Sequence, residues 1–222
     1  MLTKDYLMRM IDTLVKALAK LIFLKDAKDY NAALAELNNI TKEFFGLDLN
    51  FIDNISDKQL IELIGKNELL LPGNCYVFGV LMKEEGELFE IQGSKNRAIN
   101  LYERSFSLFI EGLKNSPTII EPDHLNKINL LILKLNEFEI TIDTEEKLFF
   151  FYEFTGNYAN AEDVIYNLIE YDDTYIDKGV QFCERLLDKS DEELIGGNLP
   201  REEVEESLTS LRERLKLKNN PS

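Results

Sequence analysis

The chain has 222 residues, of which 45% are hydrophobic, so it can bury a large core and does not have the composition of a disordered protein. A formal charge of −16 argues against nucleic acid as a partner, because phosphate binding needs clustered lysine and arginine. No segment reaches the roughly 20 apolar residues of a membrane span. The N-terminus also lacks the apolar stretch of a signal peptide, so we expect a cytoplasmic protein.

Charge is distributed unevenly along the sequence. Residues 1–25 carry five cations and two anions, whereas residues 137–177 carry twelve acids and Lys147 as their one cation. A solvated acidic surface and a basic first helix account for this distribution. The alternative is that the acidic block binds a basic segment, either of a partner or of the first helix itself.

The first segment has the periodicity of an amphipathic helix of five or six turns. One stripe recurs at spacings of 4, 3, 4 and 3 and consists of Leu7, Ile11, Leu14, Leu18 and Leu21. Further apolar residues widen this side, namely Met8, Met10, Val15, Ile22 and Leu24. We therefore expect the helix to pack between two neighbours or to lie in an oligomer interface. Binding to a membrane surface is a less favoured alternative.

Start and stop signals divide the rest of the chain into helices. Capping boxes are predicted at three pairs, Ser56 with Gln59, Asp143 with Glu146, and Ser190 with Glu193, and first-turn prolines at Pro122 and Pro200. Breaks are predicted at residues 46–54, 72–74, 115–122, 140–143 and 196–199. Strand signals are nearly absent. The pattern predicts an all-α protein of eight to ten helices whose short connections favour antiparallel neighbours.

One turn is diagnostic of a helical hairpin. After an aromatic-rich helix comes the sequence Thr155-Gly156-Asn157-Tyr158, and Ala161 begins the apolar face of the next helix. Gly156 can take the positive φ that ends the first helix, and Ala161 lets the returning helix approach closely. This segment resembles the turn of a tetratricopeptide repeat (TPR), in which a Gly-Asp/Asn-Tyr turn precedes an alanine.

Two weaker copies of this turn occur upstream. Gly93 is followed by Ala98 at the same spacing, with Gly86 at the family's small helix position, and Lys28 is followed by Ala33. The three turns begin at positions 28, 93 and 156, so the two intervals are almost equal, and each is close to twice the TPR period of about 34 residues. The sequence departs from the family where Lys28 replaces glycine, where Phe149 replaces the small residue, and where the closing proline is missing.

The resemblance implies a fold of stacked antiparallel helical hairpins that form an irregular TPR-like superhelix. We expect this domain to span residues 1–195, followed by a capping helix and short tail at 196–222. Residues 47–75 and 114–143 are either degenerate hairpins or insertions. The N-terminal runs 5–11 and 17–20 are also similar to uncharacterised helical proteins of Gram-positive anaerobic bacteria, and that resemblance implies no activity.

Residue types that usually carry chemistry are sparse. His124 is the one histidine and lies at a predicted helix start, where we expect it to be exposed. Cys75 and Cys183 lie far apart in the sequence without a CxxC pattern, so we interpret both as buried hydrophobic residues. Glu170, Asp172, Asp173 and Asp177 lack the alternation of a calcium loop and more simply solvate a helix end.

No glycine-rich phosphate loop occurs in the sequence. We therefore assign no catalytic, cofactor-binding or metal-binding residue and expect no cofactor. The aromatic run Phe149–Phe154 is interpreted as core packing rather than as a ligand pocket. In residues 200–217 an apolar stripe predicts a helix that caps the last hairpin or forms a dimer seam, and it consists of Val204, Leu208, Leu211 and Leu215.

These features favour a non-enzymatic helical-repeat scaffold that binds a protein or peptide. Stacked hairpins leave a surface suited to extended ligands, and the acidic block favours a basic partner. One alternative is a regulatory sensor of a small molecule or short peptide. Another is an enzyme with carboxylates hidden in a groove, whose pKa values would then be strongly raised. A homo-oligomer held by residues 1–25 is compatible with all three.

Overall fold

The described part of the chain is all-α, as predicted. The computed structural model describes the backbone of residues 2–116 and 122–219 and the side chains of residues 13–116 and 124–217. This part of the chain contains twelve α-helices and one short 3-10 helix, and no strand. The residues form two compact units, Met1–Ile140 (unit 1) and Thr141–Ser222 (unit 2).

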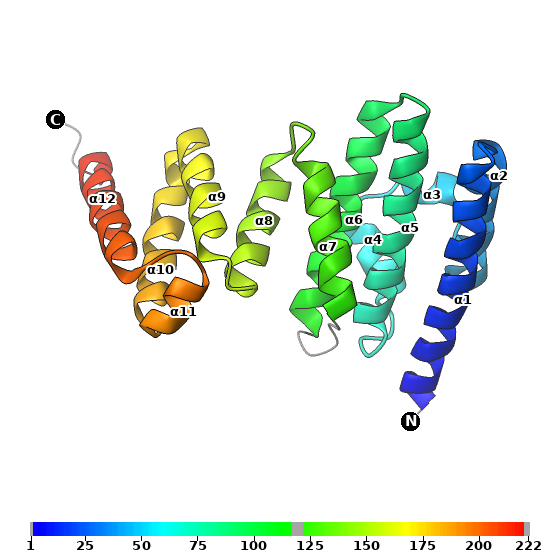
Figure 1. The fold of residues 1–222 in the computed structure, drawn as a ribbon, viewed down its shortest axis with the longest axis horizontal. Coiled ribbons are helices and arrows are strands. Elements are labelled where there is room, and N and C mark those ends of the chain that lie inside the picture. Colours follow the sequence, from blue (N-terminus) through cyan, green and yellow to red (C-terminus); the bar gives the residue numbers. More distant parts are fainter. Residues whose placement is uncertain (1, 117–121, 220–222) are drawn as a thin grey trace. The chain divides into compact units, whose positions relative to one another are not determined.

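Unit 1 is built around two helical hairpins (Figure 1). Its helices are α1 (Leu2–Asp26), α2 (Tyr30–Phe45), α3 (Leu49–Asp53), α4 (Asp57–Ile64), α5 (Leu71–Ile91), α6 (Lys95–Asn115) and α7 (Pro122–Leu135). Helices α1 and α2 form one hairpin, and α5 and α6 form the other. The short helices α3 and α4 connect the hairpins and pack mainly against α2, α5 and α6, while α7 packs against α6.

Unit 2 contains one hairpin and a C-terminal group of helices (Figure 1). Its elements are α8 (Ile142–Phe154), α9 (Tyr158–Tyr171), the 3-10 helix η1 (Asp173–Tyr175), α10 (Ile176–Leu187), α11 (Asp191–Gly196) and α12 (Arg201–Asn219). Helices α8 and α9 form the hairpin, and α10 packs against both α9 and α12.

The three turns that the sequence singles out share one backbone geometry. Lys28, Gly93 and Gly156 are all left-handed, with φ of 58°, 82° and 76°. In each turn the next residue donates its amide to a carbonyl five residues earlier, and these bonds join Asp29 to Leu24, Ser94 to Phe89, and Asn157 to Tyr152. The alanines that follow are fully buried in all three hairpins. The weak copies at Lys28 and Gly93 are therefore structural equivalents of the turn at Gly156.

Lys28→Gly and Gly93→Ala are expected to change the stability of unit 1 in opposite directions. A side chain in the left-handed region costs roughly 1–2 kcal/mol, and a Cβ at Gly93 would meet nothing within 4 Å, so its effect is purely conformational. We expect Gly93→Ala to lower the free energy of unfolding by about 1 kcal/mol and Lys28→Gly to raise it by up to about 1 kcal/mol. Urea unfolding of both variants tests this, and a shift of the same sign in both would contradict it.

Close packing of α5 against α6 explains a second predicted feature, the small residue at position 86. A Cβ on Gly86 would lie 2.6 Å from Cε1 of the Tyr102 ring and 3.3 Å from the carbonyl of Ala98. Tyr102 is fully buried at this crossing. In the α8–α9 hairpin the equivalent residue is Phe149, which lies in the core of unit 2 beside Phe182. The hairpins thus share their turn but differ in how closely their helices approach.

Several helix boundaries differ from the sequence prediction. Within the described residues twelve helices form rather than eight to ten, and one of them, α3, lies inside the predicted break at 46–54. The break predicted at 72–74 is wrong, since Pro72 lies in the first turn of α5, where its missing amide is not needed. The box predicted at Asp143 is also wrong. Helix α8 starts two residues earlier, and Thr141 accepts the amide of Thr144.

The other start signals lie where the sequence places them. Ser56 with Gln59 and Ser190 with Glu193 both form complete capping boxes. Pro122 begins α7, although its side chain lies outside the described residues, and Pro200 directly precedes α12. Of the two open gaps, 47–75 contains the short helices α3 and α4 and the start of α5. Within 114–143 the described residues form the end of α6, then α7 and the start of α8. Neither gap contains a second long hairpin among the described residues.

The C-terminal segment is part of the core of unit 2. The apolar stripe of α12 is buried there together with the apolar face of α9, and the buried stripe residues are Val204, Leu208 and Leu211. Gly197 lies against the diagnostic turn, where its carbonyl accepts the amide of Ala159 at 3.1 Å. A Cβ on Gly197 would lie 2.2 Å from the Tyr158 ring. This stripe therefore covers the hairpin within its own unit instead of forming an exposed seam.

Candidate functional site

Arg104 is the centre of a charged cluster in unit 1. Its residue is only 8% exposed, and its guanidinium donates from Nε to Asp57 at 2.8 Å. The two Nη atoms donate to the carbonyls of Ile52 and Ile55 at 3.1–3.2 Å. These acceptors lie at the end of α3 and the start of α4. One side chain of α6 therefore fixes the junction between the two short helices.

Glu85 of α5 lies beneath the same junction. The residue is 2% exposed, and its carboxylate is 3.6 Å from the Arg97 guanidinium, which bonds more closely to Asp53 at 2.5 Å. Burial, and then the charge of Asp53, raise the pKa of Glu85 to about 7, against the lowering effect of Arg97 and Arg104. Glu85 is thus a buried acid whose charge state changes near neutral pH. We call Asp53, Asp57, Glu85, Arg97 and Arg104 the Glu85 cluster.

The Glu85 cluster fastens a layer of apolar side chains. Ile52 of α3 and Leu60 and Ile64 of α4 are buried against residues of α5 and α6, which are Cys75, Phe78, Met82 and Leu108. Arg97 and Arg104 bond to acids of α3 and α4. These bonds hold the apolar layer in place against α5 and α6. The sequence left open an enzyme with two carboxylates held close together. Glu85 and Asp53 are the pair in the Glu85 cluster that comes nearest to this arrangement.

A second charged network ties the end of α1 to α5. Lys25 bonds to Glu84 at 2.5 Å and to Glu87 at 2.7 Å, and Lys83 bonds to the same two carboxylates. Burial lowers the pKa of Lys25, but Glu84 and Glu87 outweigh it and raise the pKa overall. Lys25 is therefore charged at neutral pH and holds two largely buried acids.

Lys25→Met is expected to lower the free energy of unfolding of unit 1 by about 2 kcal/mol, because Glu84 and Glu87 lose a partner while partly buried. Lys20→Met is the matched control. Lys20 also bonds to a glutamate, Glu36 at 2.6 Å, but its side chain is largely exposed, so a loss of at most about 1 kcal/mol is expected. Urea unfolding measures both variants. Equal losses in the free energy of unfolding would show that the buried network stabilises unit 1 no more than an exposed ion pair does.

Helix α1 has an exposed apolar face opposite its buried one. Leu14 and Leu21 are buried as predicted, whereas the predicted positions Leu7 and Ile11 lie outside the described side chains. The outer face of α1 consists of Val15, Ala19, Ile22 and Phe23. All four are exposed, and Phe23 is 71% exposed. Lys16 and Lys20 lie beside this face and give it a basic flank.

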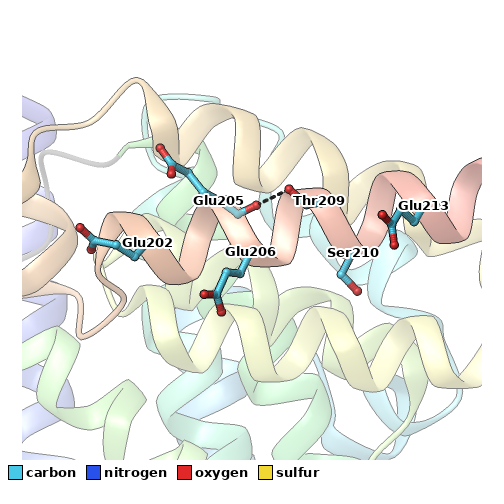
Figure 2. A pocket seen from close by; sticks show the side chains of 6 residues that line it. All are labelled: Glu202, Glu205, Glu206, Thr209, Ser210 and Glu213. Atoms are coloured by element: carbon cyan, nitrogen blue, oxygen red, sulfur yellow. Dashed lines mark hydrogen bonds between the residues drawn. The ribbon is translucent and has the colours of Figure 1, made fainter.

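Helix α12 presents an acidic face to solvent (Figure 2). Its side chains line a shallow hollow of about 520 Å³ and are Glu202, Glu205, Glu206, Thr209, Ser210 and Glu213. All six come from one helix and are exposed, so no second element encloses the hollow. We call these residues the acidic face of α12.

The acidic block is partly neutralised by cations that are distant in sequence. Glu153 accepts two bonds from Arg185 of α10 at 2.7 and 2.8 Å. Lys178 lies 3.6 Å from Glu146, and Arg214 of α12 lies 3.7 Å from Asp173. The two first-helix cations with described bonds, Lys20 and Lys25, pair with acids of α2 and α5 rather than with this block. The charge of residues 137–177 therefore overstates the free charge of this surface.

Comparison with known proteins identifies the chain at the level of a family. A model of the family of unknown function DUF6483 matches residues 1–216. The chain belongs to the DUF6483 family. No curated protein and no solved structure gives a match. Among the described helices of this DUF6483 protein, none combines the length and apolar character that a membrane crossing requires.

The residues singled out in the DUF6483 sequence do not converge on one site. His124 is partly buried rather than exposed, because its ring packs against Tyr76 of α5 in a tilted arrangement, with ring centroids 3.9 Å apart. Cys75 and Cys183 are buried as predicted, and burial raises the pKa of each thiol to about 12, which leaves both unreactive in the folded state. Asp172 accepts the amide of Thr174 and so caps the start of η1.

The aromatic run of the DUF6483 chain divides between core and surface. Phe149 and Phe151 are buried, which confirms the core interpretation for these two. Phe150 and Phe154 stack on each other nearer the surface, with ring centroids 5.8 Å apart. Because residues four apart share one helix face, both rings lie on the same face of α8.

Sequence reasoning missed the Glu85 cluster altogether. A signal was present, since Glu85 lies three residues after Met82 and three before Leu88, within an otherwise apolar helix face. Arg104 interrupts the face of α6 in the same way, between Leu101 and Leu108. A charged residue inside an apolar stripe indicates a buried partner. The acids of α3 and α4 that bond to the arginines are distant in the sequence, where spacing gives no information.

Proposed function

We propose that this DUF6483 protein is a non-enzymatic cytoplasmic scaffold that binds a protein or peptide partner through the outer face of α1. The observation that supports this proposal is the exposure of Val15, Ile22 and Phe23 along one helix whose opposite face is already buried. A soluble helix needs a single apolar stripe, so a second stripe on the same helix is typical of an interaction surface.

The energetics of this face suit a moderate-affinity contact. Complete burial of a side chain such as valine, isoleucine or phenylalanine contributes about 1.5–3 kcal/mol. Phe23 is the natural anchor, because aromatic residues dominate the binding energy of interfaces. Lys16 beside the face favours a partner with an acidic group next to an apolar centre.

The hairpin arrangement agrees with this role. Three hairpins carry the same turn at nearly equal intervals, at Lys28, Gly93 and Gly156, which is the argument for an irregular TPR-like scaffold. Helical repeats use their surfaces to bind extended segments of other proteins. The acidic face of α12 is a further candidate surface of the same scaffold, and it suits a basic segment.

The test is a comparison of matched variants. Phe23→Asp places a charge on the outer face of α1, whereas Leu217→Asp places one on another exposed apolar residue in α12. Each protein is used to capture partners from a lysate of its native cells, and each recovered protein is purified for titration calorimetry. We expect one partner to bind the wild type and Leu217→Asp equally and to bind Phe23→Asp at least about tenfold more weakly.

Light scattering of the same three proteins tests the homo-oligomer alternative. A dimer that Phe23→Asp converts to a monomer would make a second copy of the chain the partner. If nothing binds directly and the wild type is monomeric, or if Phe23→Asp binds as tightly as the wild type, the proposal is wrong. In either case unchanged thermal unfolding of Phe23→Asp establishes that the variant is folded.

An acid–base role for Glu85 is the second candidate function. The pKa of Glu85, raised to about 7 mainly by burial, favours the hypothesis of an enzyme with buried carboxylates. Both arginines of the cluster hold acids of α3 and α4, so this candidate requires those short helices to move before a substrate could reach Glu85. Partner binding that is unaffected by Glu85→Gln would separate the two functions.

A further inference from the structure

Residues 48–64, which we call the α3–α4 segment, are held on α5 and α6 by three kinds of contact. Arg104 bonds to Asp57 and to the carbonyls of Ile52 and Ile55 at the junction of the two helices. The apolar side chains of the segment are buried beside Cys75. Nδ2 of Asn74 donates to the carbonyl of Ile64, at the end of α4, at 2.7 Å.

Glu85 is the one group of the cluster that is almost fully buried beneath this segment. The charged groups that face it are Asp53 of α3, Arg97 and Arg104 of α6, and, through Arg104, Asp57 of α4. Helix α1 also packs against α5, but its Lys25 bonds to Glu84 and Glu87 instead. With Glu85 ionised the cluster holds three anions and two cations, and with Glu85 neutral its charges balance.

We propose that Glu85 is a proton-operated latch of the α3–α4 segment. When Glu85 is neutral, Arg97 pairs with Asp53 alone, and the segment stays closed over α5 and α6. Ionisation places a second carboxylate, itself only 2% exposed, beside that of Asp53, and opening of the segment hydrates Glu85. The opened segment uncovers the apolar surface around Cys75. The latch operates whether or not the outer face of α1 binds a partner, so it goes beyond the proposed function.

The direction of the pH effect follows from proton linkage. Glu85 has a pKa of about 7 in the closed form and the ordinary value of 4.5 when the segment is open and the side chain is hydrated. The closed form therefore binds the proton more tightly, and acid favours closure. The equilibrium constant for opening is expected to rise about tenfold per pH unit between roughly pH 5 and 7 and to level off above that range.

Reaction of Cys75 with a pyridyl disulfide reagent measures the opening. Rates are compared between the full-length wild type and Glu85→Gln at each pH, which cancels the intrinsic pH dependence of the thiol. We expect the ratio of the two rates to be near 1 at pH 4.5 and to reach the order of 100-fold above pH 7. Cys183 in unit 2 is expected to give a ratio near 1 throughout. Glu62→Gln, an exposed change on α4, should follow the wild type.

Amide hydrogen exchange separates a local opening from unfolding of unit 1. The exchange rates of amides in residues 49–64 should differ between wild type and Glu85→Gln with the same pH dependence as the Cys75 rates. The exchange rates of amides in α6 should not differ. The latch would be overturned if the ratio of the two Cys75 reaction rates did not vary with pH. It would also be overturned if amide exchange in α6 changed as much as in residues 49–64. Asp53→Asn provides an independent check, because removal of the neighbouring charge should shift the levelling-off to lower pH. If the pH at which the rate ratio levels off does not change, the proposed repulsion between Glu85 and Asp53 is absent.

Discussion

Arg104→Met is expected to lower the free energy of unfolding of unit 1 by about 3–5 kcal/mol, the usual cost of removing one member of a buried ion pair. The substitution removes the arginine donors from Asp57 and from the carbonyls of Ile52 and Ile55, of which that of Ile52 keeps the amide of Ile55. Methionine fills a similar volume, so the loss reports the missing bonds rather than a cavity. Urea unfolding of the full-length protein measures it.

Arg97→Met is the matched control for this prediction. Arg97 lies two turns earlier on α6 and bonds to Asp53 at 2.5 Å, but its side chain is 46% exposed. Water can replace this pair, so a loss of at most about 1 kcal/mol is expected. Arg104→Lys should fall between the two, because lysine keeps the charge but lacks the fork of donors. Equal destabilisation by Arg97→Met and Arg104→Met would contradict the assigned role of Arg104.

Gly197→Ala is expected to destabilise unit 2 by about 3 kcal/mol, at the upper end of overpacking effects. The Cβ would lie 2.2 Å from the Tyr158 ring and 2.5 Å from the carbonyl oxygen of Gly156. The ring is held in the core, and the oxygen belongs to the backbone of the hairpin turn. Neither can yield without moving the turn itself.

The adjacent glycine provides the control in the same loop. A Cβ on Gly196 would meet nothing within 4 Å, and this residue is the last of α11, where alanine is tolerated better than glycine. We expect Gly196→Ala to be neutral or slightly stabilising. Thermal unfolding of both variants, followed by hydrogen exchange of residues 158–171, assigns the change to unit 2. A neutral Gly197→Ala would mean that the turn and the C-terminal segment are not in close contact.

Local patterns predicted much of the fold. The turn at Gly156 predicted a hairpin, and the same spacing found its equivalents at Gly93 and Lys28, even though lysine stands where glycine is expected. The capping boxes at Ser56 and Ser190 were also correct. These features are local, because each depends on residues within one or two helical turns. The resemblance to TPR proteins beyond the turns stays a prediction.

Features that depend on distant residues were not predicted. Glu85 lies well downstream of Asp53 in the sequence, and Arg104 lies 47 positions from Asp57. Periodicity can indicate that Arg104 is buried, but not which acid compensates it. The short helix α3 was missed for a related reason. Five residues carry too little periodicity, and its position depends on bonds from α6.

The position of Arg104 has a consequence for synthesis of the chain on the ribosome. Helices α3 and α4 leave the ribosome before the side chain that joins them exists, since Asp57 precedes Arg104 by 47 residues. At roughly 5–20 residues per second, this delay lasts about 2–10 seconds. During that interval Ile52, Leu60 and Ile64 have neither their arginine clamp nor the surface of α6 to cover them. The nascent chain thus has a defined period in which this apolar segment is available to chaperones.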